Sequence, residues 1–276
     1  MRELVRKKSL EIFAGITVLL AYAPIILWMW DRWFARDSYY SHGVLVPFVT
    51  AYLIWQKKDA LSRLTPTRSS WGIALIASGI LLYILSSIFR VYFTSGFSLL
   101  LVLFGLVLHF YGPVITREIA FPLGFLFFMF PLPLVLVVGL SFKMKLFAAT
   151  IAANVLKGMG IYAQQEGSII IMRTAYVIVD DVCSGLRSLI SLMALGSIFA
   201  YWLKGHIIKR VFVFFMTVPI AVVTNVFRIV VICLVAEIWG PQYTVGLVHT
   251  LAGLSVFALA FLLLFILVKL LESEKA

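Results

Sequence analysis

Three side chains in the C-terminal third of the sequence could act together in acyl transfer: Cys183, Arg228 and His249. A thiol near a permanent positive charge reacts more readily as the thiolate, which is the nucleophilic form. An imidazole can carry a proton to a leaving amine, and a guanidinium can stabilise the oxyanion of a tetrahedral intermediate. The three groups are sufficient to break a peptide bond through a thioester. With water as the acceptor the reaction is proteolysis, and with an amine or hydroxyl it is group transfer.

Neighbouring residues could complete such a site by binding substrate or by supporting the reacting groups. Ser184 and Gly185 directly follow the thiol, and the glycine allows close backbone approach. Arg187 lies one helical turn beyond the thiol, so its side chain either reaches the same pocket or binds a carbonyl group or a lipid. Asn225 lies about one turn before Arg228 and could orient it.

Each of the three groups also has an ordinary structural interpretation. Cys183 could be a small buried hydrophobe. Arg228 could extend to the membrane interface or pair with Glu237, and His249 could form a hydrogen bond between helices. The other cysteine, Cys233, lies in an apolar run and is expected to serve packing only.

The composition indicates an integral membrane protein. The 276 residues are 63% hydrophobic and only 13% charged, and the net charge is +11. Soluble domains are about 45–50% apolar, so a water-soluble fold is excluded. The Lys and Arg residues lie in short connections between apolar segments, where they determine topology, and not on a polar domain that could bind nucleic acid. Neither a metal nor a cofactor is expected.

The elements that must position these groups are apolar helices. An apolar helix of about 20 residues crosses the hydrocarbon core, and the sequence predicts an all-α polytopic protein forming a single domain over residues 1–276, with its catalytic core at about 119–270. The expected second span is short for a crossing, and Pro131 and Pro133 interrupt the fifth. The eight expected spans are approximately 10–30, 43–55, 71–89, 93–111, 119–138, 184–203, 211–235 and 247–268.

Two further elements are expected between the fifth and sixth spans. The segment after Pro133, which carries Lys143, Lys145 and Lys157, has the spacing of an interfacial amphipathic helix. Residues 164–182 contain β-branched runs bounded by Gly and Asp, which predict a small pair of strands forming an extracytoplasmic cap.

Positive charge predicts the orientation, because Lys and Arg flanking the spans are retained on the cytoplasmic side. Most of the basic residues agree with a topology in which both termini are cytoplasmic. At about 1.5 Å of rise per residue, the thiol, guanidinium and imidazole lie about 31, 27 and 30 Å above the basic residues that mark the inner ends of their spans, namely Lys204, Arg210 and Lys269. The three groups are therefore expected at one level, at the extracytoplasmic edge of three consecutive helices.

The residues that carry these features resemble the exosortase and archaeosortase family of membrane-embedded sorting enzymes. The resemblance covers most of the chain. It is carried by five segments: Cys183-Ser184-Gly185-Leu186-Arg187-Ser188, Asn225 to Arg228, His249 with Gly253, Tyr40-Ser41-His42-Gly43-Val44-Leu45-Val46-Pro47, and Phe121-Pro122 through Phe130-Pro131-Leu132-Pro133.

The resemblance implies a Cys-Arg-His catalytic set at Cys183, Arg228 and His249. It also implies substrates that are membrane-anchored proteins with a C-terminal signal of the PEP-CTERM kind, made of a short motif, a transmembrane helix and a basic tail. Processing would take place at the outer face of a bacterial inner membrane, among membrane lipids, with an acceptor that the resemblance does not identify. His42 lies at an expected outer boundary and could line the substrate entrance, although anchoring in the interface is the simpler role.

Two other functions are compatible with parts of the pattern. A transporter or a protein that handles lipid-linked sugars could use Arg228, His249 and Arg187 to bind an anionic substrate. Ion-coupled transport is disfavoured because no Asp or Glu lies well inside an expected span. A non-enzymatic scaffold would leave the grouping of thiol, guanidinium and imidazole unexplained.

Overall fold

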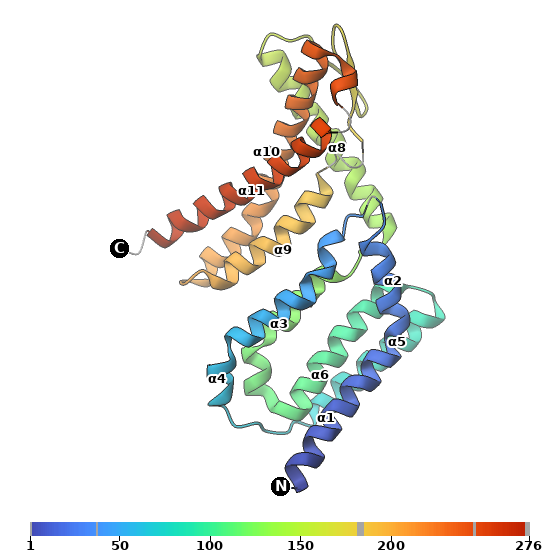
Figure 1. Ribbon diagram of the computed structural model, residues 1–276, viewed down its shortest axis with the longest axis vertical. Helices are drawn as coiled ribbons and strands as arrows, with labels where there is room; N and C mark the ends of the chain where they lie inside the picture. The colour runs from blue at the N-terminus through green and yellow to red at the C-terminus, as the bar shows by residue number, and fades with distance from the viewer. Residues whose placement is uncertain (1, 37, 181–184, 245–246, 274–276) are drawn as a thin grey trace. The chain divides into compact units, whose positions relative to one another are not determined.

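The computed structural model describes residues 2–36, 38–180, 185–244 and 247–273, and it is predominantly helical (Figure 1). The chain divides into two compact units, Met1–Leu132 and Pro133–Ala276. Five helices are long and apolar enough to cross a membrane, and a sixth span results if one bent helix pair is counted as a single crossing. Three more apolar helices have 10–17 residues. The all-α polytopic fold is confirmed, whereas the expected count of eight spans is not.

In the part that the structure describes, all regular elements of the N-terminal unit are helices. The unit begins with a pair of helices that bend by 59° at their junction, and Pro24 lies in the first turn of the second helix. Its elements are α1 (Arg2–Ala21), α2 (Ala23–Trp33), η1 (Ser41–Val44), α3 (Val46–Gln56), α4 (Lys58–Ser62), α5 (Trp71–Ile88), α6 (Tyr92–Glu118), α7 (Ala120–Phe125) and η2 (Leu126–Met129).

Helices α5 and α6 form a hairpin whose backbones approach closely through glycines. A Cβ atom on Gly72 would lie 2.6 Å from the carbonyl oxygen of Gly105, and one on Gly79 would lie 2.7 Å from Cγ2 of Val102. Small residues at helix interfaces allow this approach in membranes, where helices associate through packing because lipid is as apolar as the side chains. The hairpin therefore depends on the absence of side chains at these positions.

The expected fifth span is interrupted at its prolines. The 3-10 helix η2 ends at Met129, and Phe130 is extended with φ −83° and ψ 121°. Proline disfavours the helical conformation in the residue before it, so Pro131 and Pro133 prevent helix α7 from continuing into α8. The segment expected to cross as one helix is thus divided between the two units.

The C-terminal unit places a long central helix, α10, against three others. Helix α10 contacts α9, α11 and α8, and α9 also contacts α11 (Figure 1). Its elements are α8 (Leu134–Gly158), β1 (Gln164–Glu166), β2 (Ile169–Ile171), β3 (Tyr176–Ile178), α9 (Leu186–Trp202), α10 (Ile207–Trp239), η4 (Pro241–Thr244) and α11 (Leu247–Ser273).

Helix α8 differs from the expected interfacial amphipathic helix. It runs for 25 residues, and the most apolar part has a mean hydropathy of 1.9, which is sufficient for a membrane span. Its lysines lie among apolar residues rather than on one polar face, and only 22% of that apolar window is buried inside the protein. Length and hydropathy therefore place α8 among the candidate spans.

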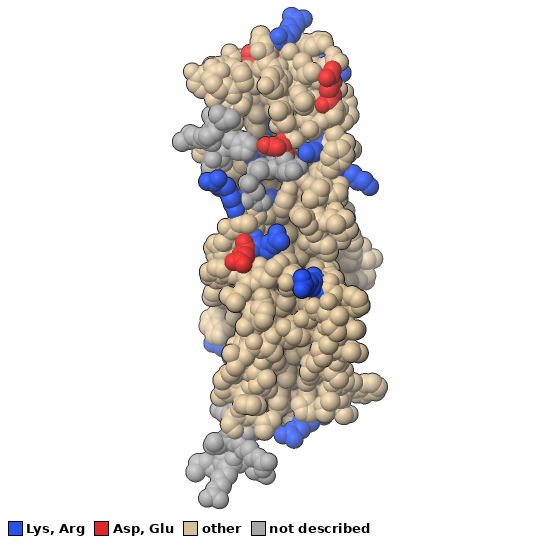
Figure 2. All heavy atoms as spheres, turned by 90° about the vertical axis from the view of Figure 1, so that its right-hand side faces the viewer, with Lys and Arg blue, Asp and Glu red and all other residues tan. Residues whose placement is uncertain are grey.

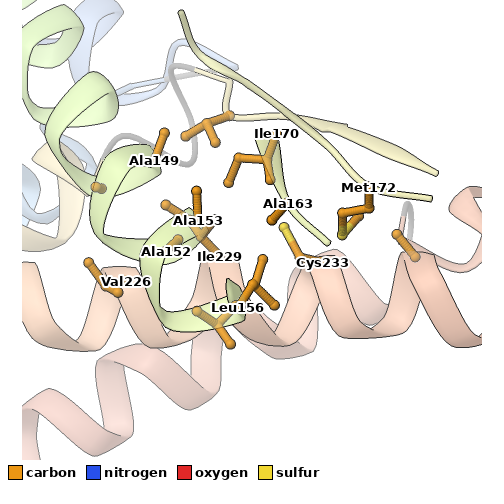
Figure 3. Close-up of a cluster of buried hydrophobic side chains, with 14 residues drawn as sticks. Ala149, Ala152, Ala153, Leu156, Ala163, Ile170, Met172, Val226, Ile229 and Cys233 are labelled. Carbon is orange, nitrogen blue, oxygen red and sulfur yellow. The ribbon is translucent and has the colours of Figure 1, made fainter. Parts of the chain in front are cut away.

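The expected strand pair is present with one additional strand. Strands β1, β2 and β3 form an antiparallel sheet in sequence order, with Gln165 opposite Ile170 and Ile170 opposite Val177. We call this sheet, residues 164–178, the cap. Its underside packs on small side chains of α8 and on the C-terminal half of α10, where Ile170 and Cys233 are fully buried (Figure 3).

Much of the molecular surface is apolar. On the face shown in Figure 2, charged side chains form isolated patches among uncharged residues. Large hydrophobic side chains on the candidate spans are exposed, including Val135 at 84% and Trp71 at 78%. Exposed apolar patches of this extent do not occur on soluble monomers, so the surface is that of a protein solvated by lipid.

Candidate functional site

The first helical turn of α9 depends on Gly185. This residue is the N-cap of α9 and has a φ of +80°, in the left-handed region that residues with a Cβ rarely adopt. Helix α9 starts at Leu186, so its free N–H groups and positive dipole end face the chain that precedes Gly185. Cys183 and Ser184, the predicted nucleophile and its neighbour, lie outside the described residues.

Gly185 also makes a close contact between α9 and α10. A Cβ atom at this position would lie 2.8 Å from Cγ and 2.9 Å from Nδ2 of Asn225. Asn225 is only 2% exposed, within an otherwise apolar part of α10. Asn225 thus lies against the start of α9, and its predicted role in orienting Arg228 stays a prediction.

Arg228 lies one turn beyond Asn225 on α10 and contacts α11. Its side chain is buried with an exposed fraction of 7%. Its guanidinium lies at Gly253, where an added Cβ would be 3.6 Å from Nη2 and 3.8 Å from Cζ. A Cβ atom at Gly253 would be in ordinary van der Waals contact with the guanidinium, so this position leaves no space for a larger side chain. A buried charge is costly in a membrane helix and usually indicates a functional role.

His249 is placed by the helix that carries it. The residue lies in α11, four residues before Gly253 and therefore on the same face, one turn toward the N-terminus. The backbone position of His249 is thus about one turn from the point where Arg228 meets α11. Its side chain lies outside the described part of the structure.

Arg187 lies in the first turn of α9 and is half-buried. Its Nε atom is enclosed, and no described residue accepts a hydrogen bond from it. A donor held at this end of the helix is suited to bind an anionic or carbonyl group that approaches the same place.

The structural alternative in which Arg228 pairs with Glu237 is disfavoured by geometry. Glu237 lies nine residues beyond Arg228, which is about 13.5 Å along the axis and on the opposite face of the helix. Its carboxylate instead binds the cap: Oε2 accepts hydrogen bonds from the backbone N–H of Thr174 at 3.2 Å and from the Thr174 hydroxyl at 2.8 Å. The Thr174 hydroxyl also lies 3.1 Å from the Glu237 carbonyl oxygen.

His42 belongs to the N-terminal unit. Burial lowers the pKa of His42 to about 4, and a hydrogen bond with the backbone of Phe128 opposes this shift only in part. The neighbouring Gly43 packs against the indole of Trp33, whose Nε1 donates to the carbonyl oxygen of Met129 at 2.9 Å. These contacts describe a neutral imidazole in a tightly packed corner, and the predicted role of His42 in substrate binding stays a prediction.

Two features of this site were not predicted from the sequence. One is the contact between the Arg228 guanidinium and Gly253. The sequence does show that Gly253, which has no side chain, lies on the same helix face as His249. The other is the attachment of the cap to α10 through Thr174 and Glu237. Their separation of 63 residues leaves no local pattern from which it could be predicted.

One of three comparisons with known proteins identifies a family. A family model described as transmembrane exosortase matches residues 13–266, which is nearly the whole chain. Searches among curated proteins and among solved structures found no significant match. The matched region covers most of both units and contains Cys183, Arg228 and His249. The chain therefore belongs to the transmembrane exosortase family, whose members are membrane-embedded cysteine transpeptidases that sort proteins.

Proposed function

We propose that this protein cleaves C-terminal sorting signals with Cys183 as nucleophile, Arg228 as oxyanion stabiliser and His249 as proton carrier. The observation that carries the proposal is the buried Arg228 on α10, which contacts α11 at Gly253. One turn away on the same helix, Asn225 contacts the start of α9 at Gly185. A fixed positive charge is thus held where three helices meet, beside the segments that carry the thiol and the imidazole.

The proposed reaction has two steps, formation of a thioester and its transfer to an acceptor. The Cys183 thiolate attacks the scissile carbonyl, and the negative charge that develops on its oxygen is stabilised by the guanidinium of Arg228. When the C–N bond breaks, protonated His249 gives its proton to the leaving amine, and a thioester remains. An acceptor then attacks the thioester, loses its proton to His249 and releases the thiolate.

The residues around the set have supporting roles in this proposal. The dipole of α9 favours negative charge before Gly185, which stabilises the thiolate form of Cys183. Asn225 positions Gly185 and thereby the segment that contains the nucleophile. Arg187 and Ser184 would bind the substrate near the scissile bond.

The substrate class follows from the family and from the distribution of charge. A protein with a short motif, a transmembrane helix and a basic tail, as in PEP-CTERM proteins, would keep the tail on the cytoplasmic side and present its motif at the outer interface. We propose that the active site lies at that extracytoplasmic face of a bacterial inner membrane, with both termini of the chain in the cytoplasm. Water or a hydroxyl or amine acceptor would complete the reaction.

The decisive experiment uses the two cysteines as a matched pair. The full-length protein is co-expressed with a tagged substrate that ends in the three-part signal, and the substrate size is followed on a gel. Cys183→Ala should abolish processing, whereas Cys233→Ala should leave it intact because Cys233 is a fully buried core residue. Processing that continues in Cys183→Ala would remove the nucleophile assignment.

A thioester intermediate provides an independent readout. Hydroxylamine attacks thioesters and should release the cleaved substrate as a hydroxamate from the wild-type protein. Arg228→Gln should form little of this product although it contains the nucleophile. A hydroxamate yield from Arg228→Gln equal to that of the wild type would contradict the oxyanion role.

A further inference from the structure

Strand β3 has an open edge, and the register identifies which of its groups point outward. The backbone N–H of Val179 donates to the carbonyl oxygen of Ser168 at 2.8 Å, and that of Met172 donates to Ala175 at 2.9 Å. Between these pairs, Val177 lies opposite Ile170. Alternate residues of an antiparallel strand face opposite edges, so the N–H and C=O groups of Tyr176 and Ile178 point away from β2.

These outward groups have no hydrogen-bond partner among the described residues. Strand β3 is the last in the sheet order, and none of the strands that the structure describes covers its outer edge. The side chains of Tyr176 and Ile178 are 62% and 55% exposed. An unpaired strand edge is a template for another extended chain. The edge of β3 can therefore add a fourth strand.

The strand that offers this edge is firmly held. Val179 and Ile170 are buried in the core shared with α8 and α10 (Figure 3). Thr174, in the turn that precedes β3, donates to Glu237 of α10 from both its backbone N–H and its hydroxyl. The edge is thus a rigid surface, and pairing with it would not require the cap to become ordered first.

The side chains along the edge of β3 also favour the binding of an extended peptide. On the exposed face of the cap, Ile169 lies opposite Ile178, and Ile171 lies opposite Tyr176. This face is apolar at β3 and polar at β1, where Gln164 and Glu166 are exposed. An extended peptide at the β3 edge would place every second side chain beside Tyr176 and Ile178, which provides selectivity in addition to the main-chain hydrogen bonds.

The edge lies close in the chain to the proposed nucleophile. Cys183 lies five positions after Ile178. Because an extended chain spans at most about 3.6 Å per residue, the two are no more than about 18 Å apart. A peptide of a few residues paired with β3 is long enough to reach the thiol.

We propose that the extended segment preceding the transmembrane helix of the substrate binds as a fourth strand on the open edge of β3. This inference rests on the proposed function, since it concerns how the same site receives its substrate. The strand pairing would hold the peptide extended and present its scissile bond toward the segment that carries Cys183.

The first test removes a hydrogen-bond donor from the open edge. Ile178→Pro eliminates the outward N–H without breaking the pairing with β2, because proline is tolerated on edge strands whose N–H faces away from the ladder. The expected result is a fall in kcat/KM for processing of about tenfold or more. Ile178→Val, which keeps the N–H and a similar side chain, should process at nearly the wild-type rate.

The second test does not depend on the folding of the proline variant. A photo-reactive benzoylphenylalanine replaces Tyr176 or, as the matched control, Tyr162, which is another exposed tyrosine that directly precedes the β1 side of the sheet. Both are introduced into the Cys183→Ala chain together with the tagged substrate. The substrate should be cross-linked from position 176 and not from position 162.

The outcomes separate this inference from the proposed function. If Ile178→Pro folds and processes the substrate as well as the wild type does, the proposed strand addition is wrong, while the sorting activity stands. Cross-linking from position 176 only to lipid, or equally from both positions, would also overturn it. If the wild type fails to process any such substrate, the proposed function fails first and the inference fails with it.

Discussion

Replacing Gly185 by alanine should damage both the stability of the protein and the proposed site. The new Cβ would occupy a backbone with φ +80° and lie 2.8 Å from Cγ of Asn225. A residue with a Cβ in the left-handed region costs about 1–2 kcal/mol, and overpacking in a rigid interior costs about 1–3 kcal/mol. The sum predicts a loss of roughly 2–5 kcal/mol in the free energy of unfolding.

Part of this cost can appear in activity instead of stability. If the start of α9 moves to relieve the contact, the predicted nucleophile two residues earlier moves with it. Each 1.4 kcal/mol lost from transition-state stabilisation lowers the rate about tenfold. We therefore expect Gly185→Ala to reduce processing of a tagged substrate at least tenfold while the protein still inserts and folds, as measured by yield and thermal unfolding in nanodiscs.

Two control variants isolate the cause. Gly253→Ala makes the same chemical change in α11, but its Cβ would be 3.6 Å from the nearest atom of Arg228 and therefore in ordinary contact. This variant should fold normally. Asn225→Ala removes the two closest atoms that the new Cβ of Gly185→Ala would meet, at 2.8 and 2.9 Å. The double variant Gly185→Ala with Asn225→Ala should therefore show a smaller stability loss than the two single losses combined.

The reasoning would be refuted by either of two results. One is a Gly185→Ala protein as stable and as active as Gly253→Ala. The other is strict additivity of the stability losses in the double variant, which would show that the Cβ of residue 185 does not meet Asn225.

Four further predictions follow from the structure. Arg228→Lys should lose most processing, about 100-fold or more, because a lysine cannot reproduce the planar guanidinium, and near-normal turnover on the gel would contradict this role. Gly253→Leu should displace the guanidinium and abolish processing although Gly253→Ala does not, which the same assay measures. Thr174→Val should lower the free energy of unfolding by about 1 kcal/mol through loss of its hydroxyl bonds to Glu237, and an unchanged melting temperature would argue against them. Burial lowers the pKa of His42 to about 4. The contribution of neutral His42 to stability is therefore complete above about pH 6.5 and decreases by up to about 3 kcal/mol as the pH falls toward 4. His42→Gln should remove this part of the pH dependence of thermal unfolding.

The sequence by itself determined the class of fold and the most promising residues. Mean hydropathy is a local property of a segment, so the membrane assignment did not require knowledge of what packs against what. The β-branched runs at 169–171 and 176–179 predicted strands correctly because strand propensity and turn residues agree over short distances. The motif around Cys183 and the isolated Arg228 and His249 were also visible without a structure.

The hydrophobic periodicity of the sequence did not predict the boundaries and lengths of several helices. The interruption of the expected span 119–138 could be predicted from the prolines at 131 and 133, but a hydropathy pattern does not show that α8 begins anew at Leu134 and continues to Gly158. The segment with Lys143 and Lys145 was expected at the interface, yet it belongs to a helix of 25 residues. Its apolar content is compatible with both an interfacial helix and a membrane span, and only the length of the continuous helix favours the span.

Tertiary structure alone decided how distant residues meet. Gly185 contacts Asn225 across 40 positions of sequence, and Arg228 contacts Gly253 on the next helix. Both contacts exist because a residue without a side chain lies opposite a polar one, and this match depends on the rotation of each helix about its axis. Helix rotation is set by packing with neighbours, so the sequence could name the groups of the candidate site but could not bring them together.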